Sequence, residues 1–113
     1  MPESATTARI VLTTVANREE ATRLGHTLVE ERLAACATVI PAVESIYWWE
    51  GKIDSSAETL LLIKTHAERI DALEARIKEL HSYRTPEFLV LAVESGSHAY
   101  LAWLEASLRE SPK

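Results

Sequence analysis

The chain has 113 residues, 47% of them hydrophobic and 26% charged, a composition that is ordinary for one globular domain. Its formal net charge of −5, without a run of lysine or arginine, argues against nucleic acid and an anionic membrane as partners. No apolar stretch approaches the ~20 residues that span a bilayer, and the first residues lack a signal region. The single cysteine, Cys36, forms no internal disulfide, so we expect a cytoplasmic protein.

The first half of the chain predicts a tail, a strand, a helix and a second strand. Residues 1–7 are expected to be a disordered tail and residues 8–113 one domain. Residues 9–15 are β-branched and predict a strand. Asn17 and Glu20 form a capping-box pattern that begins a helix reaching about Leu33. A strand follows over residues 36–47, in which Pro41 implies a bulge or an exposed edge.

The second half predicts a turn at Gly51, a strand over about residues 58–64, a helix, a strand and a terminal helix. Thr65 and Glu68 form a second capping-box pattern, which begins a helix with apolar residues at helical spacing up to Leu80. Residues 82–86 read as a loop, and residues 88–93 as the fourth strand. Ser97 is expected to cap the short terminal helix.

The order strand–helix–strand–strand–helix–strand, plus a terminal helix, predicts an α+β ferredoxin-like sandwich. Both main helices would cover one face of a four-stranded antiparallel sheet. The other face should be polar if it met water. In the third strand, however, Leu60 and Leu62 point to one face and Leu61 and Ile63 to the other, so both faces are apolar. Covering a few hundred square ångströms of apolar surface contributes several kcal/mol at ~25 cal/mol per Å2, so a homo-oligomer is expected.

Two adjacent tryptophans, Trp48 and Trp49, stand just before the turn at Gly51. Neighbouring side chains on a strand point to opposite faces, so the two indoles cannot share one core. Either one indole is exposed, or the sheet is covered on both sides by assembly.

Five segments of the chain form a distinctive set: ERLAAC at 31–36, IYWWEGKI at 46–53, LIKT at 62–65, LHSYRTPE at 80–87 and YLAWL at 100–104. In order and spacing, over about residues 8–108, they resemble the CutA divalent-cation-tolerance proteins. The resemblance implies a ferredoxin-like subunit with an extended hairpin, assembled as a homotrimer similar to the PII signalling proteins. The trimer interface is then expected to include Tyr47, Trp48 and Trp49.

His81 and Cys36 are the candidate metal ligands, because imidazole and thiolate both bind Cu(II) or Zn(II). The alternatives are that Cys36 is a small buried hydrophobe and that His81 only interacts with a helix C-terminus. The resemblance implies copper ligands at positions that here read Thr13 and Leu80–His81, so one of three survives. A ligand set would have to be assembled through space, with Cu(II) or another divalent cation as the ion and no organic cofactor.

Four further residues near the ends of the second helix predict a pocket between subunits, namely Lys64, Tyr83, Arg84 and Glu87. They supply two cations, a phenol and a carboxylate. The alternative is a polar network that only fixes the trimer interface.

The sequence contains no serine–histidine–acid pattern, glycine-rich phosphate loop or pair of carboxylates at catalytic spacing, so we expect no enzyme. We expect a trimeric protein of divalent-cation (copper) tolerance that binds metal ions weakly or transiently. The alternatives are a PII-like sensor or adaptor, which would bind a small anionic ligand through Lys64 and Arg84, and a structural scaffold.

Overall fold

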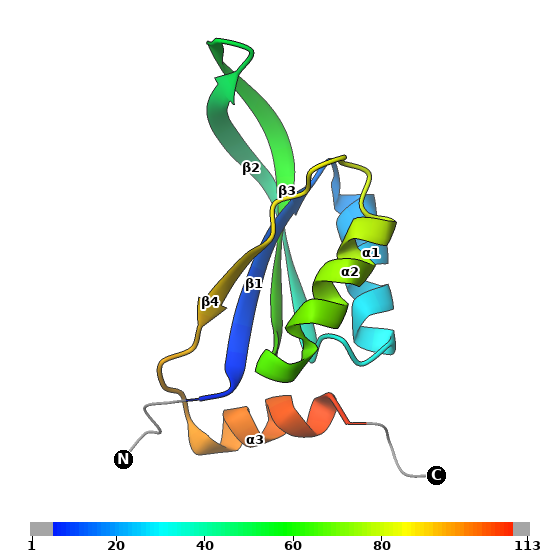
Figure 1. Ribbon diagram of the computed structural model, residues 1–113, viewed down its shortest axis with the longest axis vertical. Helices are drawn as coiled ribbons and strands as arrows, with labels where there is room; N and C mark the ends of the chain where they lie inside the picture. The colour runs from blue at the N-terminus through cyan, green and yellow to red at the C-terminus, as the bar shows by residue number, and fades with distance from the viewer. Residues whose placement is uncertain (1–5, 110–113) are drawn as a thin grey trace.

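The computed structural model describes residues 6–109, which form a four-stranded antiparallel sheet with helices α1 and α2 on one face (Figure 1). The order of strands across the sheet is β2-β3-β1-β4. The predicted α+β ferredoxin-like order is confirmed. The elements are β1 Ala8–Val15, α1 Arg18–Glu30, β2 Cys36–Trp49, β3 Lys52–His66, a 3-10 turn Ala67–Arg69, α2 Ile70–Leu80, β4 Leu89–Ala92 and α3 His98–Ser107.

The N-terminal segment that was expected to be a tail includes two described residues, Thr6 and Thr7. The Thr6 hydroxyl donates to the Val93 carbonyl, and the Thr7 carbonyl accepts from the Ala67 amide. Residues 1–5 lie outside the described part of the chain.

Strands β2 and β3 form a hairpin that projects beyond the helices (Figure 1). β3 begins at Lys52, so the prediction that it starts at about residue 58 is wrong. Its first residues show no buried–exposed alternation, and they are extended because they pair with β2 rather than because they are buried. The turn uses positive φ at Glu50 and Gly51. The bulge predicted at Pro41 is confirmed, because the register shifts between Ile40 and Val43.

The helix ends follow local hydrogen bonds. Asn17 caps α1 as predicted, with its Oδ1 accepting from the Glu20 amide at 2.8 Å. The helix ends at Glu30 rather than Leu33, because Arg32 takes a φ of 62°. The predicted cap at Thr65 is wrong, since His66 Nδ1 accepts from the Glu68 amide instead.

The main core lies between α1, α2 and the face of the sheet that they cover. Val11 and Val15 of β1 and Leu61 and Ile63 of β3 are fully buried there. A smaller cluster lies beneath α3; it consists of Ala8, Ala35, Leu104 and Leu108. Ser97 caps α3 as predicted, through the Tyr100 amide.

The face of the sheet away from the helices is apolar and largely uncovered, as the sequence indicated. Leu89 and Leu91 of β4 pair with Leu12 and Ile10 of β1 on this face. Leu89 is 55% exposed and Leu91 is 47% exposed. A single chain therefore leaves a second hydrophobic surface in contact with water.

Two buried threonines differ in their hydrogen bonding, so we predict that replacing them by valine has opposite effects on stability. The Thr13 hydroxyl is fully buried and has no hydrogen-bond partner among residues 6–109, whereas the Thr65 hydroxyl donates to the Leu33 carbonyl at 2.7 Å. We expect Thr13→Val to raise the free energy of unfolding by about 1 kcal/mol, and Thr65→Val to lower it by about 1 kcal/mol. Urea unfolding at one fixed protein concentration measures both changes. Destabilisation by both variants would contradict the assignment of the unpaired hydroxyl.

Candidate functional site

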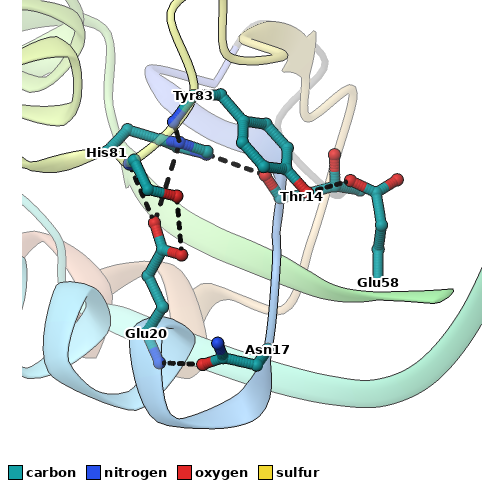
Figure 2. A network of polar contacts seen from close by, with 7 residues as sticks. Thr14, Asn17, Glu20, Glu58, His81 and Tyr83 are labelled. Atoms are coloured by element: carbon teal, nitrogen blue, oxygen red, sulfur yellow. Dashed lines mark hydrogen bonds and ion pairs between the residues drawn. The ribbon is translucent and has the colours of Figure 1, made fainter. Parts of the chain in front are cut away.

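The loop that follows α2 is held at its start by the buried side chain of His81. The ring Nε2 lies 2.8 Å from the Thr14 carbonyl of β1, and Nδ1 accepts from the Tyr83 amide at 2.9 Å (Figure 2). A backbone N–H can only donate, so Nδ1 carries no proton and the neutral ring donates from Nε2. Both nitrogens of the predicted metal ligand are thus engaged within the chain, and a metal ion would have to displace one of these bonds.

Glu20 of α1 holds the same loop from the other side. Its carboxylate accepts from the amide of Ser82 at 3.0 Å and from the Ser82 hydroxyl at 2.9 Å. Burial raises the pKa of this carboxyl, but the two bonds from Ser82, together with smaller contributions from His81 and the Ala16 backbone, lower the pKa of Glu20 below its usual value. Glu20 Oε2 also lies 3.8 Å from His81 Nδ1, which is too long for a hydrogen bond.

Tyr83 connects the loop to β3. Its hydroxyl donates to Glu58 Oε2 at 2.7 Å, and its ring lies 4.7 Å from the His81 ring, centroid to centroid (Figure 2). Burial and the bond to Glu58 raise the pKa of Tyr83 well above its usual value, so the phenol stays protonated. Burial, and then the charge of Glu58, also raise the pKa of Glu87. The carboxylates of Glu58 and Glu87 therefore repel each other beside Tyr83.

A groove of about 560 Å3 lies between this loop and the hairpin. Its lining brings together three aromatic rings, two carboxylates and one guanidinium with smaller polar residues. The lining residues are Tyr47, Trp49, Asp54, Ser56, Glu58, Tyr83, Arg84 and Thr85. The predicted site residues Tyr83 and Arg84 are therefore together in one groove.

Lys64 lies near the C-terminal end of β3, away from the groove, and Cys36 lies beside it at the start of β2. They are directly paired across β2 and β3, and the Lys64 ammonium lies 5.7 Å from the centre of the Tyr100 ring. Lys64 lies six positions after Glu58 on β3, about 20 Å along the strand. One chain therefore does not bring Lys64 beside Tyr83 and Arg84. The pocket between subunits that the sequence analysis described stays a prediction.

Among residues 6–109, no three histidine, cysteine, aspartate or glutamate side chains are close enough together to hold a metal ion. Cys36 is only half-buried, with its sulfur 3.8 Å from the Thr38 hydroxyl. The sequence analysis missed Glu20, Asp54 and Glu58 as members of the loop and groove. Glu20 carried only a helix-cap signal, and Asp54 lay in a segment that was not recognised as a strand.

The two faces of the hairpin carry different side chains. Trp48 pairs with Ile53 on one face, whereas Tyr47 pairs with Asp54 on the other. Trp48 is 73% exposed and Trp49 is 59% exposed. The inference that the two indoles cannot share one core is confirmed.

The fold and site together define a ferredoxin-like subunit with a projecting hairpin and a polar groove at its base. A model of the family described as CutA1 divalent ion tolerance protein matches residues 9–107. The chain therefore belongs to this family, which confirms the resemblance read from its sequence.

Relatives from bacteria and plants agree with this assignment. The divalent-cation tolerance protein CutA of Pectobacterium atrosepticum is 45% identical over 102 residues, which cover 90% of this chain and 93% of that protein. The chloroplastic CutA 1 of Oryza sativa is also 45% identical, but the match spans only 58% of its length. The crystal structure of Oryza sativa CutA1 superposes with a TM-score of 0.89 at 42% identity, covering 96% of this chain and 100% of that one.

The names of the relatives span several compartments. Besides the chloroplastic plant protein, the Archaeoglobus fulgidus structure is titled as a periplasmic divalent cation tolerance protein; it is 32% identical, with a TM-score of 0.87, and covers 90% of this chain and 99% of its own. Within residues 6–109, no helix is long and apolar enough to cross a membrane. The cytoplasmic location stays a prediction.

The lowered pKa of Glu20 predicts a specific acid sensitivity. The pKa of Glu20 is lower in the folded state than its unfolded value of about 4.5, so the ionised carboxyl stabilises the fold at any pH above about 4.5. This stabilisation is lost as the pH falls through the folded-state pKa. We expect Glu20→Gln to lower the midpoint of thermal unfolding at about pH 7 and to flatten its decline below about pH 5. The exposed neighbour variant Glu19→Gln should keep the wild-type profile. An unchanged acid profile in Glu20→Gln would contradict the role of this carboxylate.

Proposed function

We propose that this protein contributes to divalent-cation tolerance as a homotrimer that binds the ion weakly. The uncovered apolar surface of the single chain is the observation that supports assembly. The largest exposed side chains on the hairpin and β4 are Ile46, Trp48, Trp49, Ile53, Leu89 and Leu91. Covering a few hundred square ångströms of such surface stabilises an assembly by several kcal/mol at ~25 cal/mol per Å2. The number of three subunits is what the family resemblance implies.

Weak rather than tight metal binding follows from the ligand positions in one chain. Cys36 offers a half-buried thiol, which as a thiolate suits copper. His81 can ligate only after giving up its bond to Thr14 or Tyr83. Each subunit thus supplies an incomplete ligand set, and a complete one would be shared between subunits.

Assembly is tested by placing a charge on the apolar face of the hairpin. We expect Trp48→Glu to reduce the mass measured by light scattering from three times the 12.6 kDa of the chain to the monomer value, because a charge buried in an interface loses its hydration. Thr22→Glu, which puts the same charge on an exposed position of α1, should leave the mass unchanged. A fully assembled Trp48→Glu protein would show that this face is not the interface.

Metal binding is tested by calorimetric titration of tag-free protein with Cu(II) and, separately, Zn(II). We expect saturable binding that Cys36→Ser weakens by about tenfold or more, since a ligand is lost. His81→Gln should have a smaller effect, and His26→Gln, which changes an exposed histidine of α1, should have none. Absence of binding to the intact assembly would make the link with metal tolerance indirect.

A second candidate function is a sensor that binds a small ligand in the groove beside the hairpin. One observation favours it: Arg84 lines the groove and makes no hydrogen bond or ion pair with any other residue in 6–109. A guanidinium that is free in a groove is available to an anionic group of a ligand.

A further inference from the structure

We propose that the groove between the hairpin and the 81–87 loop binds a small zwitterion, a molecule with one amino group and one carboxylate. This inference rests on the second candidate function, the sensing of a small ligand, and specifies the chemical class of that ligand. The groove presents both signs of charge together with aromatic walls.

The carboxylate of the ligand would bind Arg84. This side chain is unpaired within residues 6–109, although Asp54 and Glu58 line the same groove. A planar guanidinium binds a carboxylate through two parallel hydrogen bonds, and such charge-assisted bonds are about twice as strong as neutral ones. Arg84 therefore supplies the anion-binding end.

The amino group would bind Glu58 of β3. Asp54 and Glu58 both point to one face of an unbroken strand, but they lie four positions apart, about 13 Å along the strand, so one ammonium group cannot bind both. Among the described residues, Asp54 Oδ1 accepts only from the adjacent Ser55 amide, and Glu58 Oε2 accepts only from Tyr83. The other Glu58 oxygen has no hydrogen-bond partner among the described residues and can accept from an ammonium group.

Two of the three aromatic side chains of the groove are held in place before a ligand arrives. The Tyr47 hydroxyl donates to Ser56 Oγ at 3.3 Å, and the Tyr83 hydroxyl donates to Glu58 at 2.7 Å. Trp49 lies two residues beyond Tyr47 and thus on the same face of β2. Fixed rings bind an alkyl chain at low cost in conformational entropy, and their faces attract a cation.

A ligand with a single charge fits this groove less well than a zwitterion. A simple anion that binds Arg84 leaves the carboxylates of the same groove without a partner, and a simple cation at a carboxylate leaves Arg84 without one. A zwitterion pairs both ends at once and leaves neither charge facing its like.

The test compares three probes that share a four-carbon chain: γ-aminobutyrate, butyrate and butylammonium. Each is titrated into the full-length assembled protein by calorimetry and by NMR of isotope-labelled protein. We expect γ-aminobutyrate to bind at least about tenfold more tightly than either single-charge probe. The indole N–H signal of Trp49 should shift, while that of Trp48 on the opposite face should stay, which locates the binding in the groove.

Matched variants separate the two charged ends. Arg84→Gln and Glu58→Gln should each weaken γ-aminobutyrate binding by about tenfold or more, because each removes a charge-assisted hydrogen bond. Arg23→Gln makes the same change as Arg84→Gln at an exposed position on α1 and should leave binding intact.

Two results would overturn the inference in distinguishable ways. If butyrate binds as tightly as γ-aminobutyrate and Arg84→Gln abolishes both, the groove is an anion site, so the sensor function stands and the zwitterion class is wrong. If no probe binds the assembled protein, both the ligand class and the sensor function fail.

Discussion

The antiparallel pairing of β3 with β1 on one side and with β2 on the other is the constraint on which the rest of the structure depends. From Thr59 to Thr65, alternate residues of β3 are buried beneath the helices. Before Thr59 the strand has only β2 as a partner, and it continues as a hairpin beyond the core. The same strand thus belongs to the core at one end and to an exposed surface at the other.

The loop after α2 is fixed by buried polar groups from three other elements. Thr14 of β1, Glu20 of α1 and Glu58 of β3 each bind one residue of this loop. Such a network is rigid because every buried partner lost would leave an unsatisfied polar group. It also gives His81 a structural role that competes with metal ligation, since both ring nitrogens are already used.

The pleat of the hairpin separates two surfaces of different chemistry. Ile46, Trp48 and Ile53 make one face apolar and suited to contact with another subunit. Asp54 and Glu58 place two carboxylates on the other face, together with Tyr47 and Trp49, beside the loop that follows α2. By the same alternation this face continues through Leu60 and Leu62 of β3 to Leu12 of β1 and Leu89 of β4, so the groove adjoins the uncovered apolar face of the sheet.

The sequence by itself determined the order of the elements, the caps at Asn17 and Ser97 and the bulge at Pro41, because these depend on interactions within a few residues. It also indicated a second apolar face of the sheet. Only the tertiary structure decided the length of the hairpin, the separation of Lys64 from the groove and the use of both nitrogens of His81. The physical reason is distance along the chain: the bond from His81 to Thr14 joins residues 67 positions apart, and no local pattern encodes such a pairing.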